Sequence, residues 1–362
     1  MSTITRTDVE TAIRGYQDPY LEKDLIAAKA IRDIRIDGRQ VEVDVELGFP
    51  AGSYRDALAA ELQRRVEALD GAAARINVSV QIIPHEVQKG LQPLPNVKNI
   101  IAVASGKGGV GKSTTAVNLA LALQADGARV GILDADIYGP SQPRMLGCQQ
   151  KPETRDGSSW EPVISHGLQT MSIGYLIDEE TPMVWRGPMV TQALQQLLSQ
   201  TRWHDLDYLV IDLPPGTGDT QLTLSQQVPV SGAIIVTTPQ DIALLDARKG
   251  LKMFEKVNVP ILGVVENMSI HICSQCGHAE HIFGEGGGQR MAEQYQVTFL
   301  GALPLDIRIR EETDSGHPTV VMDPDGRIAQ IYREIARRAA ARLALQAKSF
   351  SRLFPKIVIE NT

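Results

Sequence analysis

The segment from Ile100 to Thr114 joins an apolar run to a glycine-rich loop that ends in Gly-Lys-Ser. Glycines let several backbone N–H groups converge, and a helix that begins near Ser113 adds the positive end of its dipole. Lys112 can then reach the β and γ phosphates of a nucleotide, and the Ser113 hydroxyl can ligate Mg²⁺. The predicted binding loop consists of Gly106, Lys107, Gly108, Gly109, Val110, Gly111, Lys112, Ser113 and Thr114.

Aspartates follow two other apolar runs, Asp134 and Asp136 after the first and Asp212 after the second. Carboxylates at the carboxyl ends of parallel strands face the ligand crevice of an open α/β sheet. We therefore expect Asp212 to bind magnesium through water. The glycine-containing segment after Asp212 could sense the γ phosphate through the Gly216 N–H, because ordering of such a loop is a common switch.

Two of the three cysteines form a Cys273-x-x-Cys276 pair. Thiols at this spacing on a turn can share one metal centre. The pair could be half of a zinc site completed by His278 and His281, a dithiol switch, or half the ligand set of an iron-sulfur cluster. A 4Fe-4S cluster with four thiolates leaves one chain two ligands short, and a homodimer meets that count without Cys148.

Residues 1–83 predict a small α+β domain with the order α-β-β-α-β. Thr7 and Glu10 fit a capping box for its first helix, which Asp18 and the following proline would end. Asp37-Gly38 fits the turn of a hairpin with one buried face. Ser53 and Asp56 can cap the second helix, and alternating apolar residues from Ile76 predict the last strand. Proline-rich residues 84–97 read as a linker.

Residues 98–347 alternate between apolar strands and helices, which predicts a doubly wound, mostly parallel α/β sheet of the P-loop NTPase type. A closing amphipathic helix is expected over 328–345. The tail, residues 348–362, permits no interpretation.

The composition limits the partners of this 362-residue chain. Its net charge of −7 and the lack of a dense Lys/Arg block argue against nucleic acid. No apolar run approaches membrane-spanning length and the N-terminus has no apolar signal core, so we expect no membrane partner and a cytoplasmic location.

The spelling Lys-Gly-Gly-Val-Gly-Lys-Ser-Thr resembles the deviant P-loop ATPases related to MinD and ParA. The resemblance implies ATP as the nucleotide and an ATP-sandwich homodimer, in which Lys107 reaches the nucleotide of the facing subunit. It also implies that Asp136 lies near the attacking water and Asp134 near the metal, so that Lys107, Lys112 and Asp136 are the catalytic residues. Asn267 is implied to pair with the adenine edge.

Over residues 98–345 the chain resembles the Mrp/ApbC iron-sulfur carrier ATPases. This resemblance implies a 4Fe-4S cluster held by Cys273 and Cys276 at the dimer interface, transfer to apo iron-sulfur proteins, contact with a cluster assembly scaffold, and control of conformation by ATP. The matching segments are Gly106 to Thr114, Asp134 to Pro143, Trp185 to Pro188, Asp212 to Asp219, Thr237 to Gln240, Glu266 to Ser269 and the cysteine pair.

The N-terminal unit resembles the MIP-type iron-sulfur assembly domains. Members of that family commonly carry a cysteine after the hairpin, where this chain has residues 49–53, Phe-Pro-Ala-Gly-Ser. Three alternatives to a cluster carrier remain at this point: a zinc-stabilised nucleotide switch, a ParA/MinD-like positioning ATPase and a reductase that passes electrons through a bridging cluster.

Overall fold

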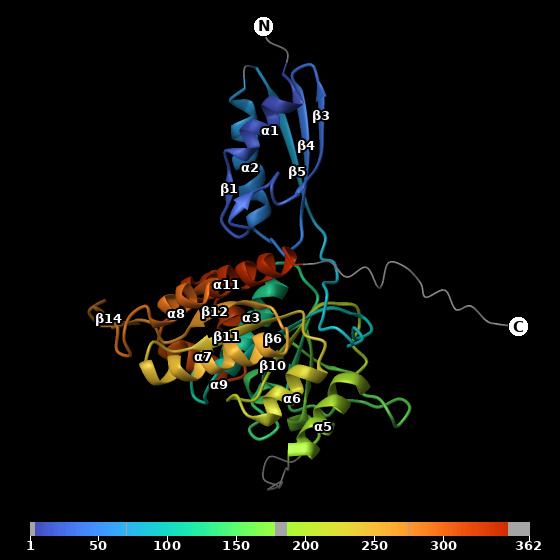
Figure 1. Cartoon of the computed structure of the whole chain (residues 1–362), viewed down its shortest axis with the longest axis vertical. Coiled ribbons are helices and arrows are strands. Elements are labelled where there is room, and N and C mark those ends of the chain that lie inside the picture. The colour runs from blue at the N-terminus through green and yellow to red at the C-terminus, as the bar shows by residue number, and fades with distance from the viewer. Residues whose placement is uncertain (1–3, 70, 178–186, 274, 347–362) are drawn as a thin grey trace, which may run out of the picture.

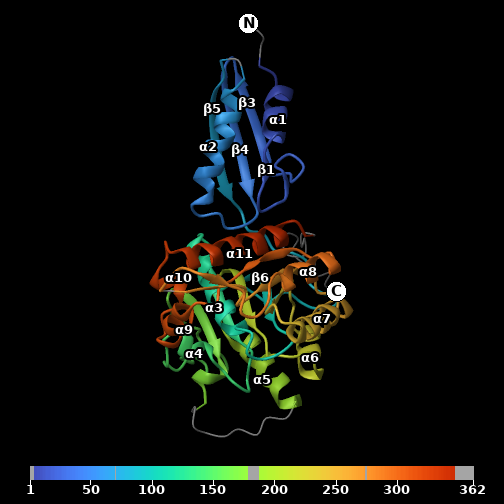
Figure 2. The ribbon, with the colours of Figure 1, turned by 90° about the vertical axis from the view of Figure 1, so that its left-hand side faces the viewer.

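The computed structural model describes residues 4–69, 71–177, 187–273 and 275–346. A small N-terminal unit stands on a larger α/β unit, with helix α11 (Arg327–Ala344) between them (Figures 1 and 2). The predicted tail and the predicted family residues Trp185 and Arg186 lie outside the described residues.

The N-terminal unit is a three-stranded sheet covered by two helices, and it also contains a short two-stranded sheet of β1 and β2 that the sequence did not predict. The other elements follow the predicted order α-β-β-α-β. Strands β3 and β4 form the antiparallel hairpin, while β4 and β5 are parallel. Alternate apolar side chains of β4 and the apolar residues of α2 belong to one buried hydrophobic cluster, which accounts for the single buried face. The elements are α1 (Arg6–Arg14), β1 (Gln17–Asp18), β2 (Lys23–Asp24), β3 (Ile31–Asp37), β4 (Gln40–Leu47), α2 (Tyr54–Glu67) and β5 (Ala73–Val80).

Three local predictions for this unit were wrong. The capping box of α1 uses Thr5 and Asp8, so the helix begins two residues earlier than the Thr7 box requires. Asp18 does not end α1; its buried carboxylate accepts hydrogen bonds from two backbone N–H groups and from the Tyr54 hydroxyl. Ser53 precedes α2 but makes no side-chain cap, because its hydroxyl faces Arg337 in α11.

The larger unit contains an eight-stranded sheet in the order β15-β12-β11-β6-β10-β7-β9-β8. Every pairing is parallel except that of the edge strand β8 with β9, which confirms the predicted doubly wound sheet. The strands are β6 (Val97–Ala104), β7 (Val130–Asp134), β8 (Val163–Ser165), β9 (Leu168–Ser172), β10 (Leu206–Asp212), β11 (Gly232–Thr237), β12 (Ile261–Glu266) and β15 (Phe299–Ala302).

Helices cover both faces of this sheet. Helices α3 (Lys112–Ala125) and α11 pack on the face toward the N-terminal unit, and α5 (Gly187–Gln200) and α7 (Asp241–Lys256) belong to the opposite layer (Figure 1). Helix α3 is apolar on nearly all sides and is buried, as a central helix must be. The other helices are α4 (Gln142–Met145), η1 (Ile173–Tyr175), α6 (Asp219–Gln227), α8 (Gly287–Tyr295), α9 (Ile307–Asp314) and α10 (Thr319–Met322).

A buried ionic cluster joins the two units. Asp126, which ends α3, accepts hydrogen bonds from the guanidinium groups of Arg333 and Arg337 in α11. Arg337 also donates to Ser53 of the N-terminal unit at 3.2 Å. The Gly52 N–H donates to the Asp126 carbonyl oxygen at 3.1 Å. The units are therefore docked through both polar contacts and a hydrophobic cluster that runs across the junction.

The predicted linker is extended but packed. The backbone N–H of His85 donates to the side-chain oxygen of Asn99 at 3.0 Å, and the Gln88 amide donates to the carbonyl oxygens of Ser225 and Val228. The boundaries at 83 and 97 remain predictions. Within the described residues, none of the helices has both the length and the apolar character needed to cross a membrane.

Replacing Arg337 with methionine should destabilise the protein. The change leaves the Asp126 carboxylate buried with Arg333 as its remaining cationic partner, so we expect a loss of roughly 2–4 kcal/mol in the free energy of unfolding. Urea unfolding of the full chain measures it. The matched control is Arg342→Met, which removes an exposed 3.7 Å ion pair with Glu22 and should cost less than about 1 kcal/mol. Equal effects of the two changes would contradict the assignment of Arg337 to a buried junction.

Candidate functional site

The glycine-rich loop connects β6 to α3 at the carboxyl edge of the sheet. Gly109 and Gly111 have φ angles of 80° and 79°, in the left-handed region that favours glycine. A Cβ atom at Gly106 would lie 2.1 Å from the backbone of Asp246 in α7, and one at Gly111 would lie 2.2 Å from the Asn267 amide nitrogen. These close approaches explain why the loop tolerates no side chain at either position.

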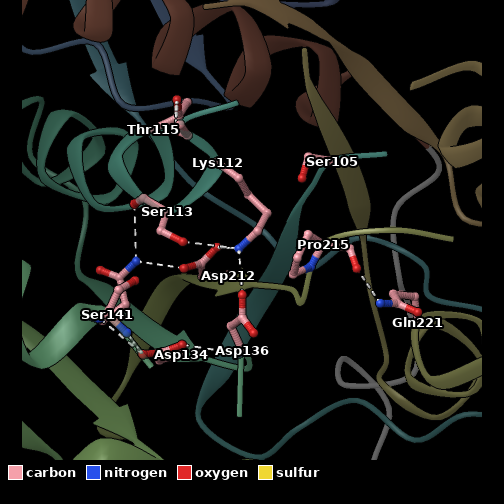
Figure 3. Close-up of polar contacts among 12 residues, drawn as sticks. Ser105, Lys112, Ser113, Thr115, Asp134, Asp136, Ser141, Asp212, Pro215 and Gln221 are labelled. Carbon is pink, nitrogen blue, oxygen red and sulfur yellow. Dashed lines mark hydrogen bonds and ion pairs between the residues drawn. The ribbon is translucent and has the colours of Figure 1, made fainter. Parts of the chain in front are cut away.

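Lys112 is the first residue of α3, and its side chain is almost fully buried. Its ammonium group pairs with Asp212, lies 3.1 Å from the Ser113 hydroxyl and lies 3.8 Å from Asp136 (Figure 3). The fold therefore brings together the lysine, the hydroxyl and two of the three aspartates that the sequence predicted. They come from α3, β10 and the loop after β7.

Asp134 is fully buried at the end of β7, where it anchors the following loop. Its carboxylate accepts hydrogen bonds from the backbone N–H groups of Asp136, Ser141 and Gln142 and from the Ser172 hydroxyl, at 3.0–3.1 Å. Burial, and next the negative charge of Asp212, raise the pKa of Asp134. Asp134 thus contacts the loop rather than Lys112 in this structure, and its predicted place near the metal remains a prediction.

Asp136 is less buried than Asp134 and faces Lys112. Burial raises the pKa of Asp136, and the Lys112 charge offsets part of that rise. A carboxylate whose pKa is shifted toward neutrality is better suited to accept a proton.

Gln142 is a site residue that the sequence analysis missed. Its side chain is buried, and its amide donates to Asp212 at 2.9 Å and to the Ser113 carbonyl oxygen at 3.2 Å. The residue follows the two predicted aspartates by a few positions, but no spacing rule links a glutamine there to Asp212. Only the fold brings the loop after β7 beside the end of β10.

Gly216 and Asn267 lie beside the phosphate loop, but the N–H groups that were predicted to contact the nucleotide are hydrogen-bonded to carbonyl oxygens of the protein. The Gly216 N–H donates to the Ser105 carbonyl oxygen at 2.9 Å, and the Asn267 amide donates to the Val110 carbonyl oxygen at 2.9 Å. Their predicted contacts with the γ phosphate and with adenine therefore remain predictions that require a change of partner.

Lys107 and Thr114 complete the predicted loop. The Ser105 hydroxyl donates to the Lys107 carbonyl oxygen, and the Thr114 carbonyl oxygen accepts a hydrogen bond from Asn118. Across the described residues we find no ion pair or hydrogen bond that holds the Lys107 ammonium group. Its side chain is available for another partner.

The cysteine pair lies on a small hairpin formed by β13 (His271–Ile272) and β14 (Ala279–Glu280). Figure 1 shows β14 at the edge of the larger unit. Gly277, with a φ of 72°, donates its N–H to the Cys273 carbonyl oxygen and closes the turn. Cys276 is exposed and Cys273 is partly exposed, so both thiols are accessible at the surface.

Backbone donors favour the thiolate form of Cys273. The N–H groups of Cys276 and Gln275 and the Cys276 thiol are hydrogen-bonded to its sulfur and lower the pKa of Cys273. A thiolate is the form that binds metals.

The two histidines of the zinc alternative have other neighbours. His281 Nδ1 lies 2.7 Å from the Ser269 carbonyl oxygen, and His278 Nε2 lies 3.7 Å from Glu280. Among the residues that the structure describes, no group of three or more His, Cys, Asp or Glu side chains could hold a metal ion.

The hairpin is connected to the phosphate loop by a short stretch of chain. Strand β12 ends at Glu266, Asn267 then contacts Val110 in the loop, and the Ser269 N–H and hydroxyl both donate to Leu303. Cys273 follows four residues later. The segment that carries the thiols thus begins at Asn267, whose side chain is hydrogen-bonded to the phosphate loop, and it is also hydrogen-bonded to the residue that follows β15.

Comparison with known proteins gives consistent relatives for both units. The family described as "NUBPL iron-transfer P-loop NTPase" matches residues 96–340, and the family described as "Iron-sulfur cluster assembly protein" matches residues 6–80. An iron-sulfur cluster carrier protein of Pseudomonas fragi is 62% identical over 76% of this chain and 97% of its own length. The carrier protein of Escherichia coli K12 is 51% identical over 95% of this chain and 94% of its own.

A solved structure has the same kind of α/β unit. It is a nucleotide-binding protein from Archaeoglobus fulgidus in complex with ADP, which is 38% identical and covers 64% of this chain and 90% of its own, with a TM-score of 0.55. Because the first family spans more than half of the chain and the two relatives cover 76% and 95% of it, this protein belongs to the family of NUBPL-type iron-transfer P-loop NTPases.

Proposed function

We propose that this chain is a homodimeric carrier that binds and hydrolyses ATP, holds a 4Fe-4S cluster between its two subunits and transfers it to apo iron-sulfur proteins. The cluster is cargo, received from an assembly scaffold. The observation that carries the proposal is the connection from the phosphate loop, through Asn267, to the exposed pair Cys273 and Cys276.

The residues around Lys112 suit a nucleotide with Mg²⁺. Ser113 and Asp212 supply oxygen donors, which Mg²⁺ prefers. The buried side-chain oxygens of Ser141 and Gln142 have no hydrogen-bond partner in the described chain, so both are free to bond to a ligand or to its water. A bound Mg²⁺ would neutralise charge that develops on the β and γ phosphates.

Lys112 exchanges partners when the nucleotide binds. Its ammonium group leaves Asp212 for the phosphate oxygens, and one oxygen of Asp212 becomes available to the water shell of the metal. Asp136 then lies beside the site with a raised pKa and accepts a proton from the attacking water. Lys107 of each subunit stabilises charge on the nucleotide of the other subunit, since its ammonium group is not held within the described part of its own chain.

The dimer follows from ligand counting. Four thiolates hold a 4Fe-4S cluster, and each subunit contributes the two on its hairpin. A twofold axis between the hairpins places the two pairs opposite each other. The neighbours of His278 and His281 give no support to a zinc site within one chain.

Exchange of Lys112 for alanine should abolish nucleotide binding, whereas Lys107→Ala should keep ATP binding and lose turnover. The reason is that Lys112 lies in its own site and Lys107 acts across the dimer. Binding of a fluorescent ATP analogue and phosphate release measure the two properties. Exposed Lys151→Ala is the control and should behave as the unaltered chain.

A mixture of the two variants tests the cross-subunit role directly. A heterodimer contains one site with an intact Lys112 that faces an intact Lys107, so it should recover part of the hydrolysis. If the mixture hydrolyses no more ATP than either homodimer alone, Lys107 does not act across the interface.

Anaerobic reconstitution tests the cluster. We expect about four irons per dimer and broad visible absorption, because two cysteine pairs complete the ligand set. Cys273→Ser and Cys276→Ser should each lose both signals, while Cys148→Ser should keep them. If each subunit instead holds one colourless zinc ion, and the His278→Ala variant does not hold it, the carrier proposal is wrong and the ATPase proposal stands.

A further inference from the structure

We propose that Gln142 is a positioning residue of the nucleotide site, which fixes the Asp212 carboxylate for the water shell of Mg²⁺. This inference rests on the proposed function, because it assigns a role within the same site. It concerns the segment from Asp134 to Pro143, in which the sequence analysis assigned roles to Asp134 and Asp136 only.

Gln142 contacts three parts of the site at once. Its backbone N–H donates to Asp134 at 3.1 Å, and its side-chain amide donates to Asp212 at 2.9 Å and to the Ser113 carbonyl oxygen at 3.2 Å. The residue begins α4 and is 1% exposed. One side chain therefore ties the loop after β7 to the end of β10 and to the start of α3.

The two oxygens of Asp212 have different partners. Oδ1 pairs with the Lys112 ammonium group, and Oδ2 accepts from the Gln142 amide. When Lys112 turns to a phosphate, the bond from Gln142 is the contact that still sets the orientation of the carboxylate. An amide suits this role because it is neutral, so the charge of Asp212 stays available to the metal.

A second observation points to a ligand. Oε1 of Gln142 is buried and has no hydrogen-bond partner in the described chain. Buried polar atoms are almost always paired, so each exception calls for an explanation. This oxygen shares one carbon with the nitrogen that contacts Asp212 and Ser113, and it therefore lies in the same site. It can accept a hydrogen bond from a metal-bound water.

The test compares Gln142→Met with Gln88→Met in the full chain. Gln88 is a matched control, since its amide also donates to two oxygens and its own Oε1 is also unpartnered, but its neighbours are Ser225 and Val228. The readouts are the affinity for a fluorescent ADP analogue, with Mg²⁺ and with EDTA, and the Mg²⁺ concentration that gives half-maximal ATP hydrolysis.

Gln142→Met should raise the half-maximal Mg²⁺ concentration about 10- to 100-fold, the usual effect of losing a residue that orients a metal-binding group. The gain in ADP affinity on adding Mg²⁺ should shrink, while the affinity in EDTA stays unchanged. A purely structural role would lower the affinity equally in both conditions. Gln88→Met should match the unaltered chain in every readout.

Gln142→Glu provides a second variant of nearly the same shape. At pH 8 the introduced carboxylate repels Asp212 and offers it no hydrogen, so the Mg²⁺ requirement should rise. Gln142→Glu keeps the shape of the side chain but removes its hydrogen-bond donor, so a rise in this variant assigns the effect to the contact with Asp212 rather than to lost packing.

The outcomes separate the two proposals. If the unaltered chain shows Mg²⁺-dependent binding and hydrolysis and both Gln142 variants match it, the role of Gln142 is overturned and the proposed ATPase stands. If the unaltered chain shows neither property, both proposals are overturned.

Discussion

The buried ion pair of Lys112 and Asp212 is the interaction on which the nucleotide site depends. It joins the first residue of α3 to the last residue of β10, two elements far apart in the sequence. Removing two charges from water is costly, and an apolar pair of similar shape is often as stable. Stability alone therefore does not explain why the pair is buried. The function proposed above does explain it, because Lys112 would exchange Asp212 for a phosphate and Asp212 would turn to the metal.

The same constraint explains the density of hydrogen bonds around the aspartates. Asp134 accepts four hydrogen bonds, and Asp212 is shared between a lysine and a glutamine. Each bond fixes a carboxylate that would otherwise repel its neighbours. These hydrogen bonds also hold the loop after β7 in place, because three of the donors to Asp134 are backbone N–H groups of that loop.

The sequence predicted those parts of the protein that follow from local pattern. The glycine spacing located the phosphate loop, and apolar runs that end in aspartate located β10 and β7, the two strands that follow β6 in the order of the sheet. The capping box of α1 was misplaced because Thr7 and Glu10 match the same pattern as Thr5 and Asp8. Contacts between distant segments had no local signal, so Gln142, the place of Asn267 and the buried Asp18 became visible only in the structure.

Helix α3 carries Lys112, for which we propose phosphate binding, at one end and Asp126 at the other. Its 14 residues give a rod of about 21 Å, and a tilt of roughly 5° about the loop end would displace the far end by about 2 Å. Asp126 is bonded to the N-terminal unit and to α11, so this far end cannot move alone. A tilt of α3 about the phosphate loop would therefore displace its Asp126 end the most, and this is the end that contacts the N-terminal unit.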